Sequence, residues 1–421
     1  MKSTEISSHI SDVLALFREH GELTRTDIMK VTGLSRSTVN QRLNQLDVAG
    51  LISSDGGGES TGGRPSSRFV FNRERAIILT ADIGASGFTV AACNLSGTPE
   101  RHIARKVNVW EGPERVLQEV HECCVELCTG STVWGIGVGV PGPVEFRAGR
   151  VVNPPIMTGW DGFDISGWFV SRYNVPVVVE NDANARAVAE SRLANADNLI
   201  SLKIGTGIGS GLVFNGQIIR GNEGAAGDIG HTRAAIASDD SPFSCRCGNV
   251  GCVEAYAGGW ALQRDLAELG ISVGEASGVV KLVKQGNFEA MRLVRQSGRI
   301  LGDAVADLVS ILNPGQIVIS GQLAECDEVL LSGVRERIYQ RSSPLATRNL
   351  RLRTSQLGEF AGVTGLAHIT IDRIFGPDSI DELLVSVSGA GRALSLSPNP
   401  SAATGRRLAV DGGLGFQVPQ A

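Results

Sequence analysis

Residues 175–184 read Val-Pro-Val-Val-Val-Glu-Asn-Asp-Ala-Asn, so a short apolar run passes directly into polar side chains. Such a run, rich in β-branched residues, is typical of a buried strand. Apolar runs at 76–81, 133–140, 198–204 and 316–319 end in the same way, at glycine or polar residues. Open α/β sheets bind ligands at the carboxyl ends of their strands. The sequence therefore predicts an α/β domain with a binding site where these strands end.

Two of these strands lead into glycine-rich loops, which cover residues 82–87 and 205–211. Glycine lets a backbone approach phosphate closely, and the N–H groups of such a turn favour an anion. The candidate phosphate contacts in the two loops are Asp82, Gly84, Ser86, Gly205, Thr206, Gly207 and Gly209. For the second loop, the alternative is a tight entrance to a β-hairpin.

His231 and the segment Cys245-Arg-Cys247-Gly-Asn-Val-Gly-Cys252 place one histidine and three cysteines at close spacing. A tetrahedral zinc site needs four such ligands, and four protein ligands leave no open position, which indicates a structural Zn²⁺. The two glycines inside the segment allow it to turn back on itself. A histidine bound to zinc keeps a second ring nitrogen that can face a ligand. The alternative is a set of ordinary buried thiols.

The first 75 residues follow a different pattern. Apolar residues recur at helical spacing in Ser11–Glu19, a second short helix is expected over Thr26–Thr32, and Ser35 stands where the N-cap of a third helix belongs. One face of that third helix is apolar. The opposite face is polar and comprises Arg36, Ser37, Asn40, Gln41 and Asn44. This pattern predicts a helix-turn-helix that reads a groove of double-stranded DNA; the alternative is a helical module that binds another protein.

A wing is expected after the third helix. Residues 50–52 begin a short strand, and the glycine- and serine-rich segment Ser53–Gly63 that follows is expected to be mobile. Arg64 precedes Pro65, which holds it extended so that it can reach into a narrow minor groove. A plain interdomain linker is the alternative. Residues 1–75 are thus interpreted as an α+β winged helix-turn-helix domain that binds DNA.

The overall composition excludes several classes of protein. The chain of 421 residues has 42% apolar and 20% charged residues, which is typical of a globular protein. Its formal net charge of −5 gives no global basic field. We find no apolar run as long as a membrane span and no signal-peptide layout, so no membrane association is expected. The other cysteines lack the spacing of a disulfide framework, which favours the reducing cytoplasm.

The order of the motifs resembles the ROK family. The Asp82 loop is followed by Glu-Asn-Asp-Ala-Asn at 180–184, Gly-Thr-Gly-Ile-Gly at 205–209, Gly-Asp-Ile-Gly-His at 227–231 and then the cysteine segment. That family groups sugar kinases with sugar-responsive repressors. The resemblance implies an actin-like ATPase (ribonuclease H-like) fold of two α/β lobes over residues 76–375. The helix-turn-helix ahead of it is similar to that of the NagC and xylose-repressor branch.

The resemblance also implies roles for the polar residues. Asp182 matches the family's catalytic base, which takes a proton from a sugar hydroxyl during phosphate transfer. In a repressor the same carboxylate can accept a hydrogen bond from that hydroxyl. Asn181, His231 and Glu254 match the family's other sugar contacts. Asp228 stands where the family usually has the longer glutamate, so a water is expected to bridge it to the sugar.

Two functions follow from these patterns. The first is a DNA-binding repressor that senses a sugar or sugar phosphate and binds a palindromic operator as a homodimer or a dimer of dimers. The alternative is an ATP-dependent sugar kinase with a DNA-binding appendage, which would need ATP and Mg²⁺. Relative to family kinases, the first loop has Ala85 in place of a glycine and no lysine follows it, which favours the repressor.

Two regions complete the interpretation. An apolar helix over Glu289–Leu312 is expected to serve either the core or a subunit interface. Residues 376–421 are rich in Ser, Gly, Ala and Pro and are expected to form a disordered tail, with a short helix over Asp378–Val387 as the alternative.

Overall fold

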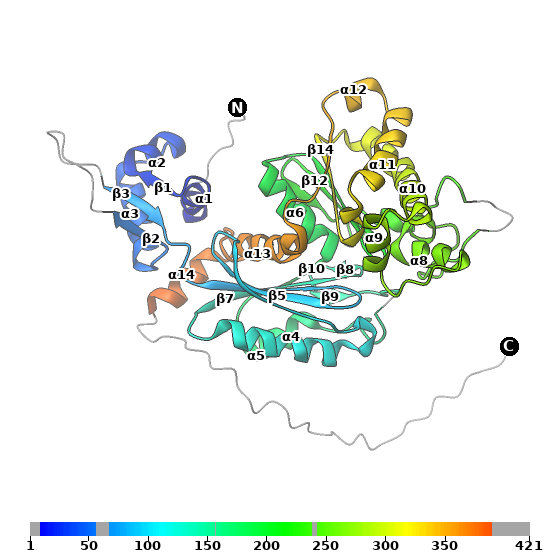
Figure 1. Cartoon of the computed structure of the whole chain (residues 1–421). Helices are drawn as coiled ribbons and strands as arrows, with labels where there is room; N and C mark the ends of the chain where they lie inside the picture. The colour runs from blue at the N-terminus through cyan, green and yellow to red at the C-terminus, as the bar shows by residue number, and fades with distance from the viewer. Residues whose placement is uncertain (1–8, 56–66, 156, 238–241, 390–421) are drawn as a thin grey trace, which may run out of the picture.

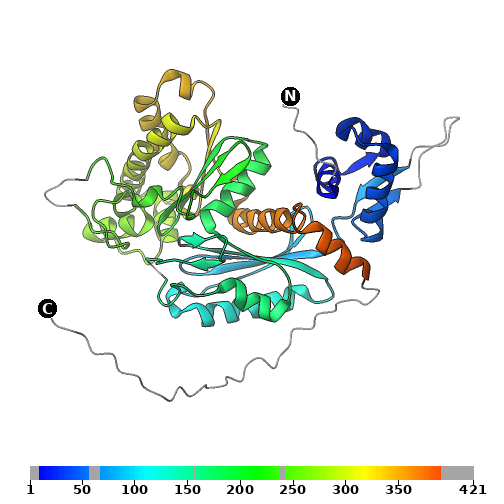
Figure 2. The ribbon, with the colours of Figure 1, turned by 180° about the vertical axis from the view of Figure 1, so that it is seen from behind.

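The structure, a computed structural model, describes residues 9–55, 67–155, 157–237 and 242–389. They form an N-terminal unit and two α/β lobes, with helices of the C-terminal segment between them (Figure 1, and from behind in Figure 2). The N-terminal unit comprises α1 (Ile10–His20), β1 (Glu22–Thr24), α2 (Arg25–Thr32), α3 (Arg36–Val48), β2 (Ile52–Asp55) and β3 (Arg68–Phe71). Its strands form one antiparallel sheet in the order β1-β3-β2.

The first two helices of the N-terminal unit begin and end near the predicted positions, and α3 begins where the sequence predicts. Ser35 caps α3 by accepting the N–H of Thr38 at 3.2 Å, and the side chains of Val39, Leu43 and Leu46 are buried in the core of the unit. The expectation of a mobile segment from Ser53 is wrong for residues 53–55, because they pair with β3 as part of β2. The rest of that segment and Arg64 lie outside the described residues.

The first lobe is built on a five-stranded sheet in the order β10-β7-β4-β5-β6. Its strands are β4 (Ile77–Ile83), β5 (Phe88–Asn94), β6 (Pro99–Arg105), β7 (Val133–Val140) and β10 (Val177–Asn181). The helices α4 (Pro113–Cys128) and α5 (Ile165–Tyr173) lie on one side of the sheet, and α13 (Ala361–Ile374) lies on the other (Figure 1). A minor hairpin, β8 (Val144–Glu145) with β9 (Arg150–Val151), and the turn η1 (Val109–Glu111) complete the lobe.

The second lobe repeats this topology. Its five-stranded sheet has the order β13-β12-β11-β14-β15, formed by β11 (Leu199–Ile204), β12 (Ile208–Phe214), β13 (Gln217–Ile219), β14 (Gln316–Ser320) and β15 (Arg351–Thr354). In both lobes the first strand is central, the next two continue it antiparallel, and the last two add in parallel on its other side. The expected two-lobed α/β fold is therefore present, and the two glycine loops occupy equivalent positions in it.

Helices fill the space around the second sheet. Between the lobes α6 (Asp182–Ala194) packs on β11, β12 and α13. The other face of the sheet packs on a cluster made by α8 (Gly259–Glu268), α9 (Ala276–Lys284), α10 (Phe288–Leu312) and α11 (Glu328–Arg341). Short elements connect them: η2 (Ile229–His231), α7 (Glu254–Ala257), η3 (Gln322–Cys326), α12 (Pro344–Thr347) and η4 (Gly358–Phe360).

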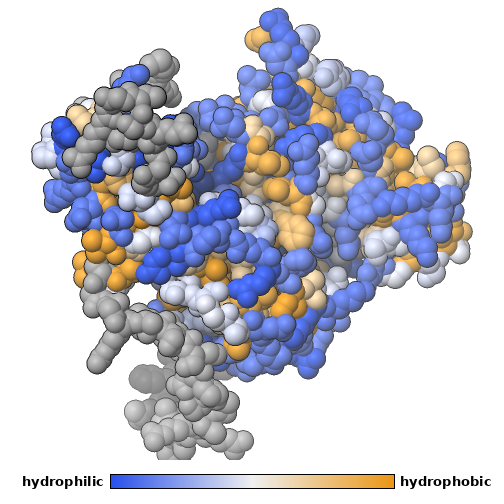
Figure 3. All heavy atoms as spheres, turned by 60° about the vertical axis from the view of Figure 1, so that its left-hand side comes forward, coloured by the Kyte–Doolittle hydropathy of each residue, from blue (hydrophilic) through white to orange (hydrophobic). Residues whose placement is uncertain are grey.

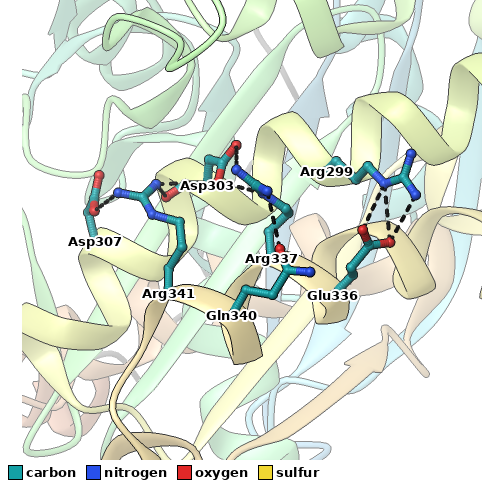
Figure 4. A network of polar contacts seen from close by, with 7 residues as sticks. All are labelled: Arg299, Asp303, Asp307, Glu336, Arg337, Gln340 and Arg341. Atoms are coloured by element: carbon teal, nitrogen blue, oxygen red, sulfur yellow. Dashed lines mark hydrogen bonds and ion pairs between the residues drawn. The ribbon is translucent and has the colours of Figure 1, made fainter.

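The helix expected over 289–312 corresponds to α10, and its inner face belongs to the core. A Cβ on Gly298 would meet the Leu330 carbonyl oxygen at 2.4 Å, so the glycine permits close packing on α11. Ion pairs flank the contact (Figure 4): the Arg337 guanidinium donates to both carboxylate oxygens of Asp303, at 2.8 and 3.1 Å, and Arg299 pairs with Glu336. Bidentate pairs of this kind fix geometry as well as adding attraction.

The expectation of a disordered tail from residue 376 is wrong for residues 380–389, which form α14 (Ile380–Gly389). Ile380 and Leu384 lie one helical turn apart and are buried in the same apolar cluster as α1 and α3. The end of α13 joins that cluster through Ile374 and Phe375. The alternative of a short helix near 378–387 is thus the better prediction. Residues 390–421 lie outside the described residues.

On the face shown in Figure 3, apolar residues occur in groups among hydrophilic ones. Among the residues described, no helix is both long and apolar enough to cross a membrane.

Candidate functional site

A cavity of about 1090 Å³ lies between the two lobes, where the central strands of both sheets end. Its wall includes every predicted sugar contact and every predicted phosphate-loop residue: Asn181, Asp182, Asp228, His231 and Glu254, and Asp82, Gly84, Ser86, Gly205, Thr206, Gly207 and Gly209. Residues from opposite lobes thus meet in one site, as the strand-end argument predicts. Two cations of this wall, Arg186 and Lys203, form ion pairs with predicted site residues and were not predicted from the sequence.

Asp182 is the first residue of α6 and is almost fully buried. Lys203, on β11, forms an ion pair with its Oδ2 atom. The carboxylate therefore has a cationic partner from the chain itself. A negative charge is also favoured here because the N-terminus of α6 carries a partial positive charge.

Asn181 has a structural task in addition to its place on the cavity wall. Its Oδ1 accepts the N–H groups of Ala183 at 3.0 Å and Asn184 at 3.2 Å, which caps α6. Its Nδ2 donates to the carbonyl of Gly142 at 3.1 Å, and so holds the turn after β7. The side chain keeps one N–H of this amide for a ligand.

Glu254 joins the cysteine segment to the second glycine loop. Its Oε2 accepts the N–H of Ile208 at 2.9 Å, and its Oε1 accepts the indole N–H of Trp260 at 3.1 Å. A Cβ on Gly207 would lie 2.4 Å from Oε2, so only glycine leaves room for this carboxylate. Gly207 therefore has a packing role that does not require phosphate.

The geometry of the histidine and the three cysteines fits a tetrahedral zinc ion. The candidate ligand atoms of His231, Cys245, Cys247 and Cys252 all lie within 4.8 Å of one another. Cys247 Sγ lies 3.7 Å from Cys252 Sγ, and Cys245 Sγ lies 3.6 Å from His231 Nδ1. With Zn–S bonds of about 2.3 Å and a Zn–N bond of about 2.0 Å, a tetrahedron places two sulfurs about 3.8 Å apart and sulfur and nitrogen about 3.5 Å apart.

Burial affects the ionisation of these groups. It raises the pKa of the Cys245 thiol to about 11 and that of the Cys252 thiol to about 12. A divalent cation would reverse this effect because it binds the thiolate. Burial also raises the pKa of the Asp228 carboxyl, against the opposing effect of the neighbouring His231.

Both glycine loops are tight hairpin turns. Gly84 donates its N–H to the carbonyl of Gly87 at 2.8 Å, and Gly205 donates to Gly207 at 3.0 Å. The hairpin interpretation of the second loop therefore describes its backbone, and the first loop has the same form. At the end of β4, Asp82 is buried and forms an ion pair with Arg186 of α6 at 2.5 Å.

The polar face of α3 is exposed. Arg36, Ser37, Asn40, Gln41 and Asn44 are all solvent-accessible, and the apolar face of the helix is buried against α1 and the sheet. Arg75 has a structural contact: its Nε donates to the Ala49 carbonyl at 3.1 Å, and its guanidinium lies over the Trp134 ring. This joins the N-terminal unit to the first lobe.

Sequence reasoning missed Lys203 and Arg186, although each had a signal. Lys203 interrupts the apolar run of β11, and Arg186 interrupts the alanine-rich helix α6. A charged residue inside an apolar run is rarely buried without a partner. The partner of Arg186 could not be predicted from the sequence, because Asp82 is 104 positions away.

Two family models match the chain. The model described as "ROK family" matches residues 78–373. A second, described as "Transcriptional regulator DIP2311-like, C-terminal domain", matches residues 6–66.

Individual proteins are similar to the chain over most of its length. It is 29% identical over 392 residues to a putative xylose repressor of Caldicellulosiruptor sp. (strain Rt8B.4), covering 87% of this chain and 96% of that protein. Its fold matches the crystal structure of a ROK family transcriptional regulator, a homologue of the E. coli MLC protein, with a TM-score of 0.76, 23% identity, and coverage of 91% and 99%. A ROK family glucokinase from Streptomyces griseus, in complex with glucose and AMPPNP, matches with a TM-score of 0.61, 26% identity, and coverage of 70% and 99%.

Proposed function

The chain belongs to the ROK family, and from this membership and the geometry above we propose that it is a sugar-responsive repressor, with operator DNA bound by its N-terminal unit and sugar bound between the lobes. One observation carries the proposal most strongly. The same chain has an exposed polar helix face ahead of a cavity lined by carboxylates and a histidine. A sugar kinase needs only the second of these features, and the similarity to a xylose repressor extends over 87% of this chain.

The N-terminal unit is proposed to bind DNA as a winged helix-turn-helix. Its second and third helices form the helix-turn-helix, and β2 and β3 form the base of the wing. The side chains of Arg36 and Asn40 have the donors and acceptors that read guanine and adenine in the major groove. One such helix reads few base pairs, so a homodimer on a palindromic operator is part of the proposal.

Variants on the exposed face of α3 test the DNA contact. Arg36→Ala and Asn40→Ala should each weaken operator binding by about 1–3 kcal/mol, or roughly 5- to 150-fold, because each removes a contact to a base edge. Val48→Ala is the matched control, since Val48 is exposed at the end of the same helix without a polar group. Operator sequences would be selected from a random DNA pool, and affinities measured by fluorescence anisotropy at fixed salt. Operator binding by both variants at the strength of the control would contradict the assignment of this face.

The sugar site is proposed to be the cavity wall around Asp182. A sugar hydroxyl can donate to the Asp182 carboxylate, and the free N–H of the Asn181 amide can donate to a sugar oxygen. His231 presents its Nδ1 toward Cys245, so Nε2, on the other side of the ring, can contact the sugar. A zinc ion held by His231 and the three cysteines would fix that ring, and Glu254 would be positioned by the same segment.

A continuous set of contacts is proposed to link the sugar to the DNA-binding unit. Asp182 begins α6, and Arg192 near the end of the same helix forms an ion pair with Asp372 of α13. The other oxygen of that carboxylate accepts from Arg18 of α1 at 3.0 Å. In this proposal sugar closes the lobes and shifts α6 relative to α13. Asp372 would then strengthen its ion pair with one arginine, weaken that with the other, and so move α1.

Asp372→Asn tests this link. The variant should bind sugar with the affinity of the wild type but lose most of the sugar effect on operator affinity, a coupling expected to be about 1–3 kcal/mol in the wild type. Calorimetry with sugar and anisotropy with DNA measure the two quantities separately. Asp378→Asn, which removes a carboxylate outside this link, is the control. An unchanged sugar effect in Asp372→Asn would exclude the carboxylate from the link.

A sugar kinase is the second candidate function. Asp182 and the likeness to a glucokinase favour it. The first loop does not, because Ala85 adds a Cβ at a phosphate loop and the loop itself contains no lysine.

A further inference from the structure

Two carboxylates in the cavity are each paired with a cation of this chain. Asp82, at the end of β4, pairs with Arg186, and the two side chains are 7% and 10% exposed. Asp182 pairs with Lys203, and these side chains are 5% and 20% exposed. All four residues line the cavity. The pairs join the strand ends of the two lobes to α6, on the same cavity wall as the two glycine loops.

The pairs do not fit a magnesium nucleotide. In phosphate transfer one carboxylate holds Mg²⁺, either directly or through a water molecule. A second carboxylate accepts the proton of the attacking hydroxyl. Oδ1 of Asp82 has no hydrogen-bond partner among the described residues, but a magnesium ion placed there would lie beside the Arg186 guanidinium. The ammonium of Lys203 occupies one oxygen of Asp182, the residue that matches the proton acceptor. The N–H of the first glycine in each loop, Gly84 and Gly205, is also donated within the loop.

We propose that Arg186 and Lys203 determine the ligand specificity of the cavity: they neutralise Asp82 and Asp182 so that the site takes a sugar and rejects a magnesium nucleotide. The inference rests on the proposed sugar-responsive function and specifies its ligand class. The signal is then sugar binding alone, with no phosphate transfer and no dependence on ATP. Arg186 and Lys203 act as internal counter-ions in place of the metal ion.

The two ligands differ in what they must displace. Mg²⁺ can bind both oxygens of Asp82 only if the ion pair with Arg186 breaks. Because the pair is buried, breaking it weakens Mg²⁺ binding by roughly two to three orders of magnitude. A sugar breaks neither pair. Lys203 contacts Oδ2 of Asp182, so Oδ1 can still accept a hydrogen bond from a hydroxyl. The Lys203 ammonium has further N–H groups that can donate to a sugar oxygen.

The test compares the zinc-loaded wild type with the double variant Arg186→Ala/Lys203→Ala. Calorimetric titration of the wild type with Mg²⁺–AMPPNP should give no binding. Titration of both proteins with Mn²⁺, followed by the electron spin resonance of the free ion, should show at least tenfold tighter binding by the variant. Removing the counter-ions leaves two carboxylates that attract a divalent cation. Arg192→Ala is the control. It removes an arginine from the helix that carries Arg186, and the ion pair that it breaks does not line the cavity.

Each outcome decides the proposal. Absence of nucleotide binding by the wild type, together with the gain of Mn²⁺ affinity in the double variant alone, supports it. Wild-type binding of Mg²⁺–AMPPNP overturns it, whether or not the double variant folds, as judged by circular dichroism. Equal Mn²⁺ affinity in the folded variant and the wild type also overturns it. Neither result bears on operator binding or the sugar response of the wild type, so failure of this inference is distinguishable from failure of the repressor function.

Discussion

Replacing Cys247 with serine should abolish the sugar response and leave operator binding intact. Cys247 is one of four groups whose spacing fits a tetrahedral zinc ion. Loss of a residue that only hydrogen-bonds to a zinc ligand lowers zinc affinity about 10–100-fold. Loss of a ligand itself should lower the affinity further. Without the ion, the ring of His231 and the start of α7 at Glu254 lose their support, and the sugar loses both contacts. The buried cluster that supports α1 and α3 contains no residue of the cysteine segment, so the recognition face should persist.

The measurement is zinc content by mass spectrometry together with sugar-dependent anisotropy on operator DNA. Cys128→Ser is the matched control, because Cys128 is a half-buried thiol outside the cluster that donates only to the Val125 carbonyl. A serine hydroxyl can make the same bond. Normal sugar response in Cys247→Ser, with zinc lost, would show that the ion does not orient the sugar contacts.

Replacing Gly365 with alanine should destabilise the fold and weaken sugar binding together. A Cβ on Gly365 would lie 1.7 Å from the carbonyl oxygen of Ala185, so α13 and α6 must separate. Overpacking of this kind costs about 3 kcal/mol or more when backbone atoms have to shift. The better helix propensity of alanine offsets only about 1 kcal/mol of this cost. Since Asp182 lies one turn before Ala185 on α6, the same shift displaces the proposed hydroxyl acceptor.

Urea unfolding followed by circular dichroism measures the first effect, and calorimetry with the effector sugar measures the second. Gly274→Ala is the control, because a Cβ there meets nothing within 4 Å and the backbone is in an ordinary conformation. Wild-type stability of Gly365→Ala would mean that the two helices are not in direct contact at this point.

Much of the site could be predicted from the sequence because it depends on local order. The apolar run 175–179 ends at polar residues, and the structure places those residues on the cavity wall with the ends of other strands. The cysteine spacing likewise brings its four ligand atoms within 4.8 Å of one another. On α3 the apolar period determines which face is buried, and therefore which face is exposed.

What could not be predicted depends on contacts between distant parts of the chain. Lys203 and Asp182 come from a strand and a helix that meet only in the folded lobes. The residues around either one in the sequence do not indicate that the two side chains form a pair. The helix α14 forms within a stretch whose composition resembles a disordered tail. It is stabilised because Ile380 and Leu384 are buried against the N-terminal unit, more than 300 positions away. Composition reports the average character of a segment and not the surface on which it packs.

The most direct test of the central claim is the operator affinity of the intact chain, measured by fluorescence anisotropy at fixed salt across a panel of sugars and sugar phosphates. The repressor account predicts specific binding to a palindromic site and a change of about 5- to 150-fold in affinity with one compound of the panel. Operator affinity that stays the same in the presence of every compound, including one that calorimetry shows to occupy the cavity, would contradict it.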